Sequence, residues 1–399
     1  MRMKWKALSL LLVCAACVEI KDDKPQKTSQ TTAAAPDSTD ISAPSYDAYS
    51  LDTAGAGARF TSTPAEDSAY SRIDQKSTSV GVSSFPAKVP ERGALALQLQ
   101  VMLDRAHFSP GIIDGVWGDN AIKALYYFRN PAGGDVAASP NDSASSIDQA
   151  TYQRLKSTLG SQQILTEYTV TDRDVKGPFS DIPDNVYEQA KLNCLCYSNA
   201  AEGIAEKFHT SQKLLAQLNP KVKLANVTAG TKLRVPNVDV EEISGTSGGD
   251  SASASNFPVG GSGQIAKLII SRKGYWTHAV DAAGMVIYHF PSTLGAGYDL
   301  SPQGDFKVTS ISWNPAFHYQ PTLFAEVPDK KPEAHLPKGP NSPVGVVWMA
   351  LSKPHYGIHG TSSPETIGYA NSHGCVRLTN WDATELGRLI SKGVPVQFL

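Results

Sequence analysis

The chain has 399 residues, with 36 lysines and arginines against 38 aspartates and glutamates and a formal net charge of −2. At about 100 to 200 residues per domain, this length leaves room for two to four compact units and their linkers. The charges nearly cancel, which argues against a function in nucleic-acid binding. We therefore look for binding and catalysis in local motifs.

The N-terminus has the composition of a secretory signal peptide. Arg2, Lys4 and Lys6 precede an apolar run over residues 7–13, which is too short to span a bilayer as a stable helix. The pattern predicts export to the cell envelope or periplasm.

A cysteine follows this run in Cys14-Ala15-Ala16-Cys17, and two small residues before a cysteine resemble a bacterial lipoprotein cleavage site. We predict that residues 1–17 form a lipoprotein signal peptide and that Cys17 receives the lipid that anchors the chain to a membrane. Secretion without a lipid is the alternative. Val18 stands where an acidic residue is associated with inner-membrane retention, which by analogy favours the outer membrane.

Residues 18–90 are dominated by serine, threonine, alanine, aspartate and proline, without helical or strand periodicity. Such a segment buries too little apolar area to order itself. We predict a disordered tether that lets the folded part reach on the order of tens of ångströms from a membrane.

Residues 91–160 contain three short helical patterns. Leu95, Leu99 and Leu103 recur at helical spacing in the first, and Asp148 can cap the third. The Ile-Asp-Gly-x-x-Gly core at residues 113–118 resembles the three-helix peptidoglycan-binding domain of wall hydrolases, although residues 131–146 form a polar insertion that departs from it. The resemblance implies binding to the cell wall, and a helical spacer that binds nothing is the alternative.

Residues 165–240 contain two helices, for which Ser198 and Ser211 are candidate caps, and a strand over residues 230–236. Together they resemble a diverged LysM module, which implies a βααβ fold and binding to glycan that contains N-acetylglucosamine. The first strand and first turn of that family match this sequence poorly, and the Cys194-Leu195-Cys196 stretch falls in that region.

Cysteine usage singles out one thiol. Of five cysteines, two belong to the predicted signal, which leaves Cys194, Cys196 and Cys375. A disulfide between Cys194 and Cys196 would close a small, strained ring, so we expect them to be small packed hydrophobes or labile thiols. An odd thiol in an oxidising compartment needs a reason, and catalysis is one.

A serine- and glycine-rich linker is predicted over residues 241–263, and the last domain over residues 264–399. Short alternating runs separated by glycine and proline turns indicate a mainly-β domain. The only helical pattern in it covers residues 381–392 and stops at Gly393. The whole chain is therefore predicted to be multidomain.

Two histidines precede the odd cysteine in this last domain. A thiol needs a nearby imidazole or aligned backbone N–H groups to act as a nucleophile at neutral pH, and His359 and His373 supply imidazoles. Gly374 leaves the backbone beside Cys375 open to an oxyanion. This combination is an acyl-transfer site in outline.

A zinc site is the sharper alternative, because His355, His359, His373 and Cys375 are four potential ligands. A His-x-x-x-His pair presents both rings on one face only in a helix, however, and residues 352–357 have the pattern of a turn and a strand. The zinc alternative is therefore weakened but stays open at this point.

The sequence His-Gly-Thr, followed at a distance by Ser-His-Gly-Cys-Val-Arg-Leu-x-Asn-x-Asp, resembles the catalytic signature of the L,D-transpeptidase (YkuD-type) family. Residues 301–306, 339–345 and 356–358 match as well. The resemblance implies a β-sandwich or barrel with a C-terminal helix.

Site residues follow from the same resemblance. It implies Cys375 as nucleophile, His359 as general base oriented by a backbone carbonyl at Gly360, and His373 as a supporting residue. Oxyanion donors would come from the backbone around Gly374. Arg377 would contact stem-peptide carboxylates, while Ser372 braces the loop and Tyr356 contacts substrate.

The implied reaction acts on peptidoglycan, serves cell-wall biogenesis and cell shape, and needs neither a metal nor an organic cofactor. Cys375 forms a thioester with the third residue of a tetrapeptide stem and releases D-alanine. An amine then takes the acyl group, which gives a cross-link, an anchored protein or an exchanged D-amino acid. Water as acceptor would make an L,D-carboxypeptidase. A wall-tethering lipoprotein without activity and an NlpC/P60-type endopeptidase are further alternatives, although in the latter group the cysteine precedes its histidine.

Overall fold

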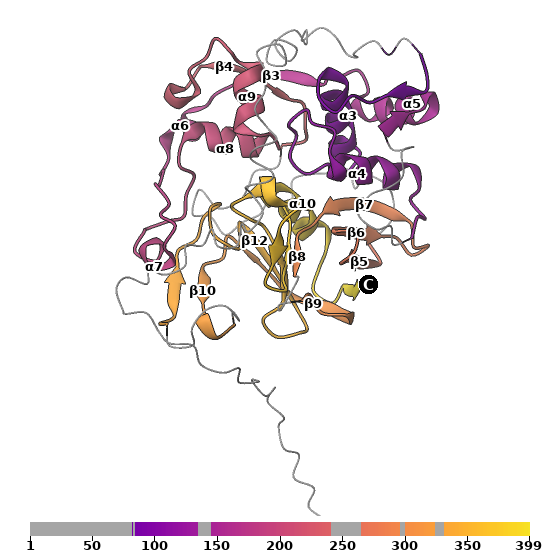
Figure 1. Cartoon of the computed structure of the whole chain (residues 1–399). Helices are drawn as coiled ribbons and strands as arrows, with labels where there is room; N and C mark the ends of the chain where they lie inside the picture. The colour runs from indigo at the N-terminus through magenta and orange to yellow at the C-terminus, as the bar shows by residue number, and fades with distance from the viewer. Residues whose placement is uncertain (1–81, 83, 135–144, 241–264, 296–299, 324–330) are drawn as a thin grey trace, which may run out of the picture. The chain divides into compact units, whose positions relative to one another are not determined.

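The structure is a computed structural model, and all of its described residues belong to one compact unit (Figure 1). Among them, no helix is long and apolar enough to cross a membrane. The predicted signal peptide with Cys17, nearly all of the predicted tether and the serine- and glycine-rich linker lie outside this part of the chain. The described residues are 82, 84–134, 145–240, 265–295, 300–323 and 331–399.

Three helices make up the first module, as predicted: α3 (Ala94–Arg105), α4 (Asp119–Arg129) and α5 (Gln149–Leu159). Asp148 caps α5, because its side chain accepts a hydrogen bond from the Thr151 N–H. A short pairing of β1 (Ala87–Lys88) with β2 (Ser146–Ile147) closes the module. We call it the three-helix module.

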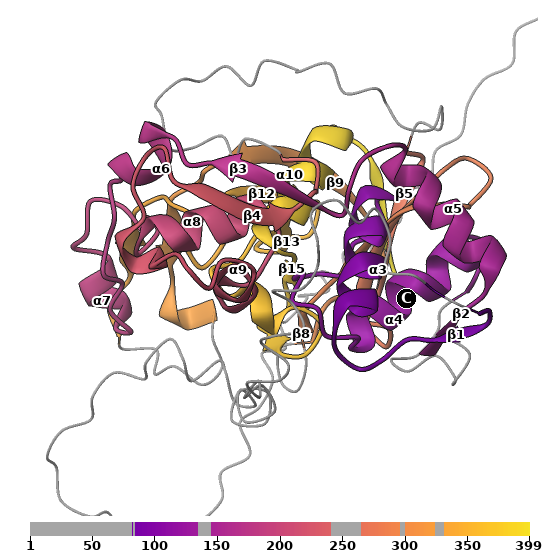
Figure 2. The same ribbon diagram turned by 90° about the horizontal axis from the view of Figure 1, so that it is seen from above.

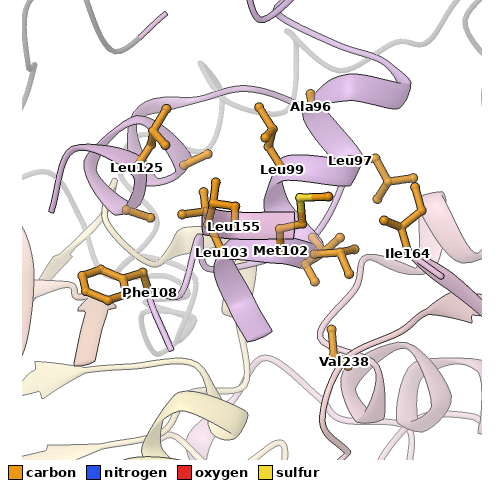
Figure 3. Packing of buried hydrophobic residues seen from close by; sticks show 14 of the residues in the cluster. Ala96, Leu97, Leu99, Met102, Leu103, Phe108, Leu125, Leu155, Ile164 and Val238 are labelled. Carbon is orange, nitrogen blue, oxygen red and sulfur yellow. The ribbon is translucent and has the colours of Figure 1, made fainter. Parts of the chain in front are cut away.

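Helix α3 is buried along most of its length, and its leucines pack against α4 and α5 (Figure 3). The same hydrophobic cluster continues into the second module through Ile164 and Val238, which lie near Leu97 and Met102 in Figure 3. The two N-terminal modules therefore share one core rather than folding around two separate ones.

The second module is built on β3 (Leu165–Thr169) and β4 (Lys232–Pro236), which pair antiparallel along their full length (Figure 2). Helices α8 (Ala200–Lys207) and α9 (Gln212–Leu218) lie between them in sequence. This is the βααβ order that was predicted, and we call it the LysM-like module. Ser211 caps α9 as predicted, whereas Asn199 rather than Ser198 caps α8, since its side chain accepts from the Glu202 N–H.

A long insertion separates the first strand of this module from its first helix. Residues 170–199, which we call the insertion, carry the short helices α6 (Asp172–Lys176) and α7 (Val186–Gln189). The insertion explains why the beginning of the LysM pattern is hard to find in the sequence.

The prediction for Cys194 and Cys196 is wrong, because they form a disulfide across Cα atoms 5.2 Å apart. Leu195 between them is fully buried, in a cluster with Leu336 of the C-terminal domain. Its N–H donates to the Lys338 carbonyl at 3.0 Å and its carbonyl accepts from the Asn341 N–H at 2.9 Å. The tight turn that a disulfide between Cys194 and Cys196 requires is therefore held in place by the backbone hydrogen bonds of Leu195 to the C-terminal domain.

The C-terminal domain is built on an eight-stranded sheet, with small pairs β8–β14 and β10–β11 beside it. This confirms the mainly-β prediction. The order across the large sheet is β15 (Val376–Arg377), β13 (Gly357–His359), β12 (Val347–Leu351), β9 (Gly304–Trp313), β16 (Pro395–Phe398), β5 (Lys267–Ser271), β6 (Trp276–Val280) and β7 (Val286–Pro291). The small pairs are formed by β8 (Leu294–Gly295) with β14 (Asn371–Ser372), and by β10 (Phe317–Tyr319) with β11 (Ala334–Leu336).

The single α-helix of this domain, among its described residues, is α10 (Asn380–Leu389), which ends three residues before the predicted end. Both N-terminal modules contact it. Asn380 Nδ2 donates to Glu206 Oε1 of α8 at 2.8 Å, and Ser109 Oγ donates to Asp382 Oδ2 at 3.0 Å. The ring of His209 also stacks on Trp381. Helix α10 is therefore where the three parts of the described chain meet.

Candidate active site

Strand pairing brings the separated histidine and cysteine motifs together. His359 ends β13, Cys375 immediately precedes β15, and these two strands are parallel neighbours in which His359 lies opposite Arg377. The chain between them passes through a 3₁₀ turn, η5 (Pro364–Thr366), and through β14. Residues far apart in sequence thus meet at one edge of the sheet.

The His359 ring is buried, with 4% of the residue exposed, and it stacks on Trp348 with centroids 5.2 Å apart. Its Nδ1 lies 2.7 Å from the Gly360 carbonyl oxygen. A carbonyl can only accept, so Nδ1 carries the proton and Nε2 is left with a lone pair. Burial, and next the positive charge of Arg377, lower the pKa of His359 to about 3. The imidazole is therefore neutral at physiological pH.

Cys375 is the free cysteine of the described chain and is half-buried. Its Sγ lies 3.6 Å from the His355 carbonyl oxygen, to which it donates. Desolvation raises the pKa of this thiol, while the backbone of Gly357 and the charge of Arg377 act in the opposite direction. The resting site thus holds a neutral thiol and a neutral imidazole rather than an ion pair.

Gly374 fixes the conformation of the cysteine loop. Its φ is +98°, and a Cβ there would lie 2.8 Å from Cε1 of Tyr356, so a larger residue would be both strained and crowded. The Gly374 carbonyl accepts from Ser301 Oγ at 2.8 Å, and the Cys375 carbonyl accepts from Ser372 Oγ at 2.5 Å. These two hydrogen bonds point the carbonyl oxygens of the loop toward Ser301 and Ser372. Within the described chain, the N–H groups of Gly374 and Cys375 have no hydrogen-bond partner.

The remaining predicted site residues lie around this loop. Tyr356 is half-buried beneath Lys353, whose Nζ is 4.6 Å from the ring centroid. His373 is half-buried next to Gly374, and Arg377 is half-buried with its backbone paired to Thr293. His355, a candidate zinc ligand, is exposed. In the described parts of the chain, His, Cys, Asp and Glu form no group of three that could hold a metal ion.

The loop between the two motifs is braced from outside. Asn120 of α4 donates through Nδ2 to the Ile367 carbonyl at 2.8 Å, and a Cβ on Gly368 would meet the Asn120 side chain. Asn380 lies on the other side of the site, where its Oδ1 accepts from the Val346 N–H and leaves no room for a Cβ on Gly360. Both contacts come from residues that the sequence analysis did not single out.

A cleft of about 290 Å³ opens between the segment 361–370 with Arg377 on one side and the insertion with α8 on the other. Thr361 and Arg377 line it from the C-terminal domain, and Asp184, Gln189 and Glu202 line it from the insertion and α8. The sequence analysis missed the latter three residues. The one sequence feature that pointed to this region was the poor match at the beginning of the LysM pattern.

Two family patterns match the chain. The YkuD family, described as the L,D-transpeptidase catalytic domain, matches residues 266–397, and the LysM domain matches residues 201–236. The second match begins inside α8, after the insertion. The peptidoglycan-binding identity of the three-helix module and the lipoprotein signal remain predictions.

Curated relatives are similar over about half of the chain. The putative L,D-transpeptidase YkuD of Bacillus subtilis (strain 168) is 48% identical over 193 residues, which cover 48% of this chain and 89% of that protein. The protein of the same name from Bacillus licheniformis is 26% identical over 195 residues, which cover 49% of this chain and 90% of that protein. The chain therefore belongs to the L,D-transpeptidase family.

Solved structures match a smaller part. An L,D-transpeptidase from Mycobacterium smegmatis is similar with a TM-score of 0.28 and 17% identity, over 34% of this chain and 58% of that one. The chain thus spans less than two thirds of the length of that structure.

Proposed function

We propose that this chain is a peptidoglycan L,D-transpeptidase in which Cys375 carries the acyl group and His359 moves the proton. The observation that supports it most strongly is the fixed tautomer of His359. Its Nδ1–H is tied to the Gly360 carbonyl, which leaves Nε2 as an acceptor at the same sheet edge as Cys375.

In the donor half-reaction, the sulfur attacks the carbonyl carbon of the third residue of a tetrapeptide stem. Because the pKa of the Cys375 thiol is raised by desolvation and that of His359 is lowered to about 3, proton transfer from Sγ to Nε2 accompanies attack rather than preceding it. The C–N bond to D-alanine then breaks, the proton passes from His359 to the leaving amine, and a thioester remains.

The developing oxyanion would be stabilised by the backbone N–H groups of Gly374 and Cys375. They are free of other partners in the described chain, and the carbonyls on the same loop are held away by Ser301 and Ser372. Preorganised donors of this kind commonly contribute on the order of 10²–10³ in rate. Arg377, two residues from the sulfur, would hold a carboxylate of the stem peptide.

In the second half-reaction an amine attacks the thioester and forms a new amide bond, while the sulfur regains a proton through His359. Water in place of the amine gives the carboxypeptidase outcome. We further propose that Cys17 carries a lipid, that residues 18–90 act as a tether, and that the LysM-like and three-helix modules bind the wall. The predicted domain boundaries belong to the same proposal.

The proposal is tested with the part of the chain that follows the proposed lipidation site, residues 18–399, and purified disaccharide-tetrapeptides. Mass spectrometry should show release of D-alanine, an acyl adduct on Cys375 and new dimers. Activity should persist in the presence of a zinc chelator. If Cys375→Ala kept the D-alanine release, the assignment of the nucleophile would be wrong.

A further inference from the structure

The cleft beside Arg377 has a second wall that the reaction above does not use. We propose that the insertion and α8 form a binding site for the ammonium group of the acyl acceptor, so that the LysM-like module selects a cationic amine for transfer. This inference rests on the proposed transpeptidase function and names the chemistry of its second substrate.

The insertion and α8 each contribute one carboxylate to this wall. Asp184 and Glu202 contribute carboxylates to the cleft, and neither forms a salt bridge within the described residues. Glu202 does accept from the Ser198 N–H at 2.5 Å and from Asn341 Nδ2 at 2.9 Å. Both donors are neutral, so they orient the carboxylate without cancelling its charge.

Gln189 adds an independent observation. It is 6% exposed, lines the cleft, and donates through Nε2 to the Pro183 carbonyl at 2.8 Å. That contact fixes the orientation of the amide, because a carbonyl cannot donate. Its Oε1 is buried and has no partner in the described chain. A buried acceptor without a partner is costly, and a small shift of this side chain toward the cleft would let an N–H donor of a ligand satisfy it.

A third carboxylate lies next to the cleft. Glu365 sits on η5, whose residue Thr366 lines the cleft. Desolvation, and to a lesser degree the charge of Glu202, raise the pKa of Glu365. A cation placed between these carboxylates would relieve their repulsion. A metal ion is disfavoured, because no described group of three potential ligands is arranged to hold one.

The acidic wall is held in place by the C-terminal domain. Leu195 is pinned by Lys338 and Asn341, and a Cβ on Gly339 would lie 2.1 Å from the Leu195 carbonyl oxygen. Tyr187 Oη donates to the Pro332 carbonyl at 3.0 Å. A wall fixed before substrate arrives loses little entropy on binding.

The transfer step balances as follows. The bound ammonium loses one proton to water, and the neutral amine nitrogen bonds to the thioester carbonyl carbon. The C–S bond breaks, and the second proton passes from the nitrogen through His359 to the Cys375 sulfur. Amide and free thiol are the products. Arg377 lies within the same cleft and suits an acceptor that also carries a carboxylate.

The test is the double variant Asp184→Asn/Glu202→Gln, assayed with tetrapeptide donor and D-methionine as acceptor. Both changes keep the size of the side chain and remove its charge, although a glutamine at position 202 can accept only one of the two hydrogen bonds that Glu202 receives from the Ser198 N–H and Asn341 Nδ2. We expect D-alanine release without acceptor to stay within about twofold of the unmodified protein, while KM for D-methionine rises about tenfold and hydrolysis takes a larger share of product. Glu188→Gln is the control, because this carboxylate is on the insertion but pairs with Lys191.

The outcomes separate the two proposals. If the unmodified protein released no D-alanine and formed no Cys375 adduct, the proposed function would fail. If it did both and the double variant kept the original KM for D-methionine, the inference about the acidic wall would be wrong. A double variant with equal loss of D-alanine release and acceptor use would also overturn it, because the wall would then be structural only.

Discussion

The two walls of the cleft are built on opposite principles. The catalytic wall meets the cleft at Thr361 and Arg377, and behind these residues it continues into short strands and glycines, a buried neutral imidazole and carbonyls tied by Ser301 and Ser372. The insertion wall consists of carboxylates on a segment anchored by a disulfide and a few backbone contacts. The function of the first wall depends on the positions of its atoms to within fractions of an ångström. The function of the second wall depends on its charge.

This difference indicates a division of labour within the cleft. Substitutions in the catalytic wall should affect formation of the thioester, whereas changes in the insertion wall should affect which acceptor resolves it. Each wall can therefore be perturbed separately. The loss of activity caused by a substitution should decrease with its distance from the reacting groups.

The largest effect is expected for His359→Ala, which removes the proton acceptor. We expect the rate of Cys375 acylation to fall by roughly 10²–10⁴. The rate is measured by mass spectrometry of the adduct under single-turnover conditions. His355→Asn is the matched control, since this exposed histidine contributes only its backbone carbonyl to Cys375 and asparagine tolerates a positive φ. Equal losses in both variants would contradict the role of His359.

A smaller effect is expected for Gly374→Ala. The added Cβ would meet Tyr356 and strain a backbone at φ +98°, at a cost of about 2 kcal/mol, or roughly thirtyfold in acylation rate. Gly393→Ala is the control, because that glycine has φ +99° with no atom near its Cβ position. An acylation rate in Gly374→Ala equal to that in Gly393→Ala would show that loop shape is not critical.

Opening the disulfide should act on the other wall. In Cys194→Ser/Cys196→Ser the Leu195 bulge loses its covalent closure, so we expect a few-fold higher KM for amine acceptors and little change in D-alanine release. Steady-state assays at several acceptor concentrations measure both. Slower acylation in this variant would mean that the walls are not independent.

The smallest effect concerns the contact between α8 and α10. Burial raises the pKa of Glu206 to about 7, above its unfolded value, despite hydrogen bonds from Asn380 and Tyr197 that act the other way. A raised pKa stabilises the fold at low pH, and this contribution is lost as pH rises through about 7. Glu206→Gln keeps the acceptor oxygen, so its Tm should match the unmodified protein at pH 5 and exceed it by a few degrees at pH 8.5. Parallel Tm curves across this range would contradict the prediction.

Local sequence was sufficient for the catalytic wall. The His359 and Cys375 motifs, the turn around residues 352–357 and the mainly-β pattern all depend on neighbours in sequence, and strand pairing joined them as the motif implied. The Asp148 and Ser211 caps could be predicted for the same reason. The catalytic roles of these residues remain proposals.

Long-range contacts account for what the sequence did not reveal. β3 is recognised only through its pairing with β4, which lies beyond the insertion and two helices. The Cys194–Cys196 disulfide depends on contacts that Leu195 makes with Lys338 and Asn341, more than 140 residues away. No periodicity in a short segment encodes such partners.

Because both N-terminal modules contact α10, the C-terminal domain cannot be separated from them without losing these contacts. Burial raises the pKa of Asp382 to about 8, and its carboxyl accepts a hydrogen bond from Ser109 Oγ of the three-helix module. A C-terminal domain cut away from its neighbours would expose Asp382, which would ionise, and would leave Asn380 without Glu206. Although the L,D-transpeptidase family pattern covers residues 266–397 alone, this domain is expected to lose stability when it is produced without the modules before it.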